Sequence, residues 1–269
     1  MIRREMKARR VGAAAEFMDS QLASGRVAFS LPALVEGTGL TAPAAMRQLL
    51  RLGRRVARVS QRFFVIVSPE HYAMGGPPVE QWLDDYFNWL GHPYYLALQS
   101  AAAAYGASPQ AIQVTQVMTD APRRPVELGR LRIRFFVKRA VGKTVTQPLA
   151  NAFAPVRVST PAATAFDLIR YAARIGGIGR AVETLKPLLP LIKARDVLAV
   201  LESEKETATT QRLGYVVEQA GRGDLASAID EWLPTKRPLT PLSPTKAVGP
   251  SARLMPRWRL LDNSLEYPP

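Results

Sequence analysis

The sequence predicts a mixed α/β fold in two parts, followed by a proline-rich extension. Residues 31–67 contain two short segments of helical apolar period, a glycine turn between them, and then two β-rich runs. Gly75-Gly76-Pro77-Pro78 interrupts this pattern, and short apolar strands and later helices follow it. From Pro234 onward, prolines recur too often for a helix or a central strand. We expect a domain over residues 1–74, an α/β domain over 79–233, and an extension, 234–269, that packs on the body or is partly disordered.

The helices of the N-terminal part have clear start and stop signals. An apolar period predicts a first helix over residues 3–24, and a short extended piece follows at 26–30. Ser30 and Thr41 are helix-capping residue types, each with a proline two positions later, inside the first helical turn. Gly37 and Gly39 lie between the two helices, where the backbone must bend.

The second of these helices has two distinct faces. Met46, Leu49, Leu50 and Gly53 follow helical spacing, so we expect this stripe to face the core. Ala44, Arg47, Gln48 and Arg51 form the other stripe. A ribbon then runs over residues 56–59, turns at 60–62 and returns over 63–67. Helix, turn, helix and ribbon in this order predict a winged helix-turn-helix, whose second helix enters a DNA groove.

The basic side chains of this segment indicate DNA as its ligand. Arginine and glutamine can contact guanine and adenine edges bidentately in the major groove, and arginines can contact phosphates without reading sequence. We expect Arg47, Gln48 and Arg51 to read bases and Arg54, Arg55, Arg58 and Arg62 to contact phosphates, with Thr41, Ala44 and Gln61 beside them. The alternatives are a basic face that is only solvated, or a winged helix that binds protein.

The distribution of charge favours a basic DNA-binding domain joined to a nearly neutral second domain. The net charge of +14 divides into +7 in residues 1–78, +3 in 79–233 and +4 in 234–269. The chain has no cysteine, which excludes disulfides and thiolate-bound zinc. No apolar run has the length of a signal peptide or a membrane span, so we expect a cytoplasmic protein without membrane contact.

The second part should hold its strands first and most of its helices later. The run from Arg130 to Phe135 alternates strictly, so Arg130, Arg132 and Arg134 should share an exposed face and provide further basic contacts. We expect helices over 79–90 and 94–105, strands over 112–118, 131–138 and 156–159, and helices over 160–174, 178–189, 194–204, 207–221 and 224–233. Residues 256–261 regain apolar content and should dock as a strand.

No group of residues makes a positive case for catalysis, a cofactor or a metal. His71 and His92 lack partners at the spacing of a metal site or a catalytic triad. Gly176-Gly177-Ile178-Gly179 follows a helix and lacks the Lys-Ser/Thr of a phosphate loop. Asp167 stands in an apolar helix, where an ion pair with Arg170 or Arg174, or a helix cap, is the simplest interpretation. We therefore expect no catalytic residues, no cofactor and no metal.

Several blocks of the second part resemble a known family. His92-Pro93-Tyr94-Tyr95-Leu96-Ala97-Leu98-Gln99-Ser100-Ala101-Ala102, followed by Tyr105-Gly106, is similar to a block of AbiEi-type antitoxins. Gln113–Thr119, the basic strand 132–136, and the run from Val156-Arg157-Val158-Ser159-Thr160-Pro161 to Asp167 follow in the order of that family. An N-terminal winged helix precedes these blocks, as in the family. Tyr105 replaces a histidine common there, and the proline-rich extension is longer than usual.

This resemblance implies an antitoxin of a type IV toxin–antitoxin system, with a role in phage defence. Its winged helix would bind double-stranded DNA at inverted repeats in its own promoter and repress the operon. Its α/β domain would counteract a nucleotidyltransferase-like toxin, and whether the two proteins form a direct complex is left open. Two alternatives remain: a ligand-responsive winged-helix regulator without a toxin partner, and an enzyme acting on nucleic acid.

Overall fold

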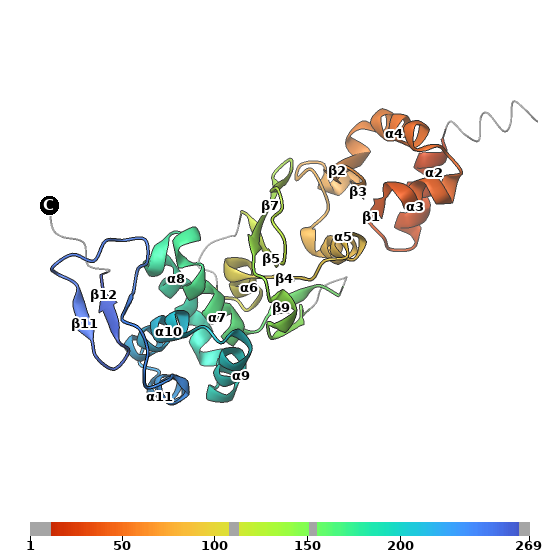
Figure 1. Ribbon diagram of the computed structural model, residues 1–269. Helices are drawn as coiled ribbons and strands as arrows, with labels where there is room; N and C mark the ends of the chain where they lie inside the picture. Colours follow the sequence, from red (N-terminus) through yellow and green to blue (C-terminus); the bar gives the residue numbers. More distant parts are fainter. Residues whose placement is uncertain (1–11, 108–112, 151–154, 264–269) are drawn as a thin grey trace, which may run out of the picture.

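The computed structural model describes residues 12–107, 113–150 and 155–263. Figure 1 shows an elongated molecule, with the module of α2, α3 and α4 at one end and strands β11 and β12 at the other. A six-stranded sheet and a group of helices lie between them. The mixed α/β fold predicted from the sequence is confirmed. No helix of the described residues is long and apolar enough to cross a membrane.

The N-terminal module has the element order of a winged helix. Helix α2 (Ala13–Ala23), strand β1 (Ala28–Ser30), helices α3 (Leu31–Thr38) and α4 (Ala42–Arg51), and strands β2 (Val56–Ser60) and β3 (Phe63–Ile66) follow one another. The strands form an antiparallel sheet of order β1-β3-β2. Ser30 caps α3, because its side chain accepts a hydrogen bond from Ala33 N, and Gly39 ends that helix in the left-handed region at φ 66°. Residues 3–11 of the first predicted helix lie outside the described residues.

One expectation about α4 is wrong. Leu50 was assigned to the core-facing stripe with Met46, Leu49 and Gly53, but 76% of Leu50 is exposed. The buried residues of α4 are Ala45 and Leu49, one helical turn apart. Leu49 follows Ala45 by four residues and lies on the same side, whereas the step of about 100° from Leu49 to Leu50 turns Leu50 away from that side. The helix is therefore rotated relative to the predicted stripe.

The central sheet has the strand order β6-β7-β5-β4-β9-β8. The β5–β7 and β4–β9 pairs are parallel and the other pairs antiparallel. Its strands are β4 (Tyr94–Leu96), β5 (Thr115–Thr119), β6 (Val126–Leu128), β7 (Leu131–Val137), β8 (Thr146–Pro148) and β9 (Arg157–Ser159). The predicted helix over 94–105 is wrong in its first turn, because β4 comes first and α6 (Leu98–Ala104) follows. All three residues of β4 are buried, so this strand lacks the polar–apolar alternation that marks a half-exposed strand.

Helices cover the sheet on the side toward the C-terminus (Figure 1). On the other side, next to the N-terminal module, lie the 3₁₀ turn η3 (Val79–Gln81) and helix α5 (Leu83–Leu90), where one helix over 79–90 was predicted. Helix α7 is the most buried helix of the described residues, with every residue from Ala162 to Ile169 inside the core, and Thr160 caps it. The later helices agree closely with the predicted ranges: α7 (Pro161–Arg170), α8 (Gly177–Leu185), α9 (Ala194–Glu204), α10 (Thr207–Gln219) and α11 (Gly223–Trp232).

The proline-rich extension packs on helix α10. Strands β10 (Thr240–Pro241), β11 (Arg253–Met255) and β12 (Leu260–Asp262) form a small sheet of order β10-β12-β11. The Trp258 ring is buried against Gly214, where an added Cβ would lie 2.0 Å from a ring carbon. The Gln211 amide donates to Trp258 O at 2.8 Å and to Pro238 O at 2.9 Å. A glycine and a buried amide on α10 thus hold the extension in place.

Strand β3 joins the two parts of the molecule. Phe64 and Ile66 belong to the core of the N-terminal module, whereas Phe63 and Val65 belong to a second core with residues of α5 and the central sheet. The Phe63 and Tyr86 ring centroids are 5.1 Å apart. Nearby, Arg130 N donates to Met74 O at 2.9 Å, and Gly75 and Gly129 approach too closely for side chains. The Gly-Gly-Pro-Pro segment therefore lies in a packed junction.

Candidate nucleic-acid interface

Helix α4 presents an exposed, basic face at the end of the molecule. Arg47, Leu50 and Arg51 are exposed, and Thr41 and Pro43 are exposed at the start of the helix. In Figure 1, α4 lies on the side of its module away from α5 and the central sheet. Within the described residues, neither Arg47 nor Arg51 has a carboxylate in ion-pairing distance. Two positive charges are therefore presented to solvent on one helix face.

Two other residues of the predicted reading stripe turn toward the protein. The Gln48 Oε1 atom accepts a hydrogen bond from Ala14 N at 2.9 Å, at the N-terminus of α2. Gln48 thereby satisfies one of the free N–H groups of that helix, and its side chain is only partly exposed. Ala44 is partly buried and packs against the module's core. Among the residues expected to read bases, the structure thus leaves Arg47 and Arg51 on the open face.

The arginines after α4 are held by local contacts. Arg55 forms an ion pair with Asp19 at 2.9 Å, with both side chains largely exposed. Arg54 lies over the Tyr72 ring, with its guanidinium carbon 4.3 Å from the ring centroid. Arg58 donates from Nε to Ser60 O at 3.0 Å and so braces the turn between β2 and β3. Gln61 and Arg62 are exposed at that turn. The contacts orient these side chains without burying their charges.

A second row of arginines begins directly before strand β7 and continues along it. Arg130, Arg132 and Arg134 are exposed, while Ile133 and Phe135 are buried, so the predicted alternation is confirmed. The Arg134 guanidinium carbon lies 5.4 Å from the centre of the Phe136 ring. The β6–β7 hairpin also contacts β2 of the N-terminal module. The row therefore begins at the junction between the two parts.

A buried network of charges lies inside the second part. Lys138, at the end of β7, contacts Asp167 Oδ1 of α7 at 3.0 Å and the Glu204 carboxylate of α9. Tyr95 donates from its hydroxyl to Asp167 Oδ2 at 2.8 Å. Arg170 closes the network by contacting both Glu204 and Glu206 at 3.1 Å. Asp167 thus has the ion pair expected of it, but with Lys138, because Arg170 reaches Glu204 and Glu206.

The burial of this network shapes its protonation. Exclusion of water raises the pKa of the Tyr95 hydroxyl well above its ordinary value, and the Asp167 charge raises it further. Tyr95 therefore stays a neutral donor to Asp167. The ammonium group of Lys138 lies between two carboxylates, so their charges are compensated within the protein. Among the described residues, no three His, Asp or Glu side chains converge as a metal site would require.

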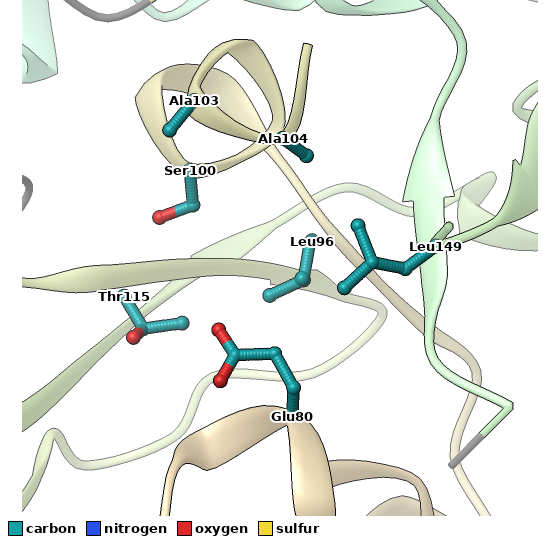
Figure 2. Close-up of a pocket in the computed structure, with 7 residues that line it drawn as sticks. All are labelled: Glu80, Leu96, Ser100, Ala103, Ala104, Thr115 and Leu149. Atoms are coloured by element: carbon teal, nitrogen blue, oxygen red, sulfur yellow. The ribbon is translucent and has the colours of Figure 1, made fainter. Parts of the chain in front are cut away.

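A small cavity lies between η3, α6 and the central sheet. Figure 2 shows the Glu80 carboxylate pointing into it, toward Thr115 and Leu96. Leu149, Ala103 and Ala104 add apolar surface and Ser100 a hydroxyl. The volume is about 290 Å³, at the lower end for small-molecule sites. A carboxylate over an apolar lining could hold a small cationic group.

Sequence reasoning missed two features of these sites. The exposure of Leu50 was missed because an apolar residue beside the buried Leu49 was assigned to the core. The Lys138–Glu204 contact was missed because its partners are 66 positions apart in the chain. The alternation of β7 did carry a signal, since it ends at a lysine directly after an apolar run.

Comparison with solved structures shows a shared fold. The "RV2827C protein from Mycobacterium tuberculosis" has 16% sequence identity and a TM-score of 0.67, covering 93% of this chain and 91% of that one. An "antigenic nucleotidyltransferase-like protein from Paracoccidioides brasiliensis" has 12% identity over 62% of this chain and 95% of that one. Its TM-score of 0.37 is too low to infer a common fold. A search of curated proteins found no match.

A family model matches part of the chain. Residues 95–219, from β4 to the end of α10, match the model of the AbiEi antitoxin C-terminal domain. This range contains the central sheet, α7 and the whole buried network. The resemblance seen in the sequence blocks is therefore confirmed over this range of the chain.

Proposed function

We propose that this protein is a cytoplasmic type IV antitoxin that also represses its own operon. The winged helix would bind inverted repeats in the promoter, and the AbiEi domain would counteract a nucleotidyltransferase-like toxin. The family match supports the antitoxin role. The exposed arginines on α4, in a module with winged-helix order, are the observation that favours DNA binding.

The geometry of α4 supports different roles for two groups of arginines, one in base reading and one in phosphate contacts. Arg47 and Arg51 project from a helix that would enter the major groove, where a bidentate arginine contact reads guanine. Arg62 at the turn of the ribbon, with Arg54, Arg55 and Arg58 behind it, would contact phosphates and supply affinity without sequence reading. Arg130, Arg132 and Arg134 would extend the basic surface beyond the winged helix.

The two activities can be separated by point substitutions in the full-length chain. Removal of residues 1–78 would uncover Trp82 and Tyr86, which share a core with β3, so a truncated protein is a poor test. In the double variant Arg47→Ala/Arg51→Ala, mobility shifts with the upstream promoter should lose specific binding. Coexpression with the neighbouring toxin gene should still rescue growth.

The result also separates the two halves of the proposal. Undiminished promoter binding by the double variant would exclude α4 as the reader. Failure of the unaltered protein to rescue growth would instead exclude the antitoxin role for that gene pair. Arg195→Ala/Lys205→Ala, which removes two exposed charges at the ends of α9, is the matched control and should retain both activities.

A ligand-responsive regulator remains the second candidate, and the cavity beside Glu80 is the observation that favours it. The cavity lies near the junction of the two parts, since η3 directly follows the Gly-Gly-Pro-Pro segment. If it controlled DNA binding, Ala103→Leu, which would fill it, should change the operator affinity of the full-length protein. An unchanged affinity would remove this candidate.

A further inference from the structure

Leu50 is the most exposed large apolar side chain in the described part of the chain. It is 76% exposed, whereas the others range from 37% for Trp89 to 55% for Leu254. Single exposed leucines are common and need no explanation by themselves. The position of Leu50 is what distinguishes it, because it lies on the exposed side of α4 together with Arg47 and Arg51.

The neighbours of Leu50 on this face are basic. Arg47 lies three positions before it, Arg51 directly after it, and Arg54 four positions after it, and all are exposed. Arg47 lies one helical turn before Leu50 on α4, whereas Arg54 follows the end of the helix, in the 3₁₀ turn η1 (Gly53–Arg55), and packs on the Tyr72 ring. Gln48 turns away from this face toward Ala14 N. The open face thus presents one apolar group between guanidinium groups.

These charges restrict what can cover Leu50. A second copy packed on this face across a twofold axis would bring the same arginines together, at an electrostatic cost. A nucleic acid duplex complements them, since its phosphates flank the groove that the helix would enter. The major groove has one apolar group of matching character, the C5-methyl of thymine.

We propose that Leu50 reads thymine, by packing on the C5-methyl group of a base next to those contacted by Arg47 and Arg51. This inference rests on the proposed DNA binding and adds a specific base preference to it. The contact would distinguish thymine from cytosine, which lacks the methyl group. Burial of one methyl group corresponds to about a fourfold to fivefold change in affinity.

The test uses the full-length protein and chemically altered DNA. Duplexes selected from a random library supply the bound sequence, and each thymine in it is then replaced in turn by deoxyuridine, which removes only the methyl group. At one or two positions, this replacement should weaken binding by the unaltered protein about fivefold. Leu50→Ala should bind the thymine duplex about fivefold more weakly and should no longer respond to the replacement at those positions.

Leu254→Ala is the matched control. Leu254 is 55% exposed on β11, remote from α4 in Figure 1, so this variant should respond to deoxyuridine as the unaltered protein does. Thermal unfolding of both variants should match that of the unaltered protein, because both side chains are exposed.

Four results would overturn the inference. Sequence-specific binding that no deoxyuridine replacement affects, or an equal response in Leu50→Ala, would leave DNA binding in place and remove the thymine contact. A change of oligomeric state in Leu50→Ala, measured by sedimentation without DNA, would assign this face to a second copy. If the unaltered protein selects no duplex, the proposed DNA binding itself fails, and the thymine contact with it.

Discussion

The arginines of α4 and the lysine that follows strand β7, Lys138, are placed in opposite ways. Arg47 and Arg51 are exposed and have no carboxylate within ion-pairing distance among the described residues. Lys138 is almost fully buried and contacts two carboxylates. A buried charge must be paired to be tolerated, whereas an exposed one remains available to a partner. The buried cluster around Lys138 therefore stabilises the fold, whereas Arg47 and Arg51 are the candidates for binding a partner.

The largest effect is expected from Lys138→Met, which would remove the buried ammonium group. Removing the ammonium would leave Asp167 and Glu204 buried without their shared cation, at a cost of about 3–5 kcal/mol in the free energy of unfolding. Urea denaturation followed by circular dichroism measures this loss. Lys143→Met, at an exposed position three residues before β8, is the control. A loss below 1 kcal/mol for Lys138→Met would show that the network is dispensable for folding.

Arg47→Ala should have its effect on binding alone. Loss of a bidentate base contact is expected to weaken operator binding by about 1–3 kcal/mol and to relax the preference at one base pair. Because Arg47 is exposed, the free energy of unfolding should stay within about 0.5 kcal/mol of the original. Fluorescence anisotropy with the operator and with single-base variants measures both affinity and preference. If the variant is destabilised and its base preference is unchanged, Arg47 has a structural role and does not read a base.

Gln48→Ala tests a residue that was expected to read bases but whose side chain caps the start of α2 in the structure. The Ala14 N–H would lose its acceptor, so we expect a loss of about 1 kcal/mol in stability. The base preference of the operator complex should be unaltered. Denaturation and selection from a random duplex library would measure the two properties. A changed base preference at full stability would return Gln48 to the reading face.

The smallest effect is expected from Arg62→Ala at the turn of the ribbon. Loss of one phosphate contact should weaken binding to all duplexes about equally and lower the slope of log affinity against log salt by about 0.9. Titrations at several salt concentrations, with operator and unrelated duplexes, measure that slope. A loss confined to the operator would instead indicate base reading by the ribbon.

Local signals predicted the N-terminal module and the later helices well. The Ser30 cap, the left-handed Gly39 and the Thr160-Pro161 helix start each act within a few residues, so they can be recognised in the sequence. The strand β4 was mistaken for a helix because its burial on both faces removes the period of two. The short strands β6 and β8 were not predicted, and β8 has no buried residue that could mark it.

The candidate sites show the same limit more sharply. Arg47 and Arg51 could be placed on the open face from helical spacing, whereas the rotation of α4 that exposes Leu50 depends on how Ala45 and Leu49 pack in the module. The helical spacing predicts that Gln48 reads bases. The hydrogen bond that its side chain accepts comes from Ala14, 34 positions away, so the spacing does not reveal it. Lys138, Asp167 and Glu204 come from three elements that only the tertiary fold brings together.

Strand β3 has a consequence for how this protein would sit on a promoter. Its residues are buried on both faces, so the winged helix and the antitoxin domain are joined by a shared layer of side chains in place of a tether. The angle between them is therefore set by packing. Two copies on an inverted repeat would hold their antitoxin domains at a distance determined by the spacing of the half-sites. The spacing of the half-sites would then also set the distance over which a toxin could contact both domains at once.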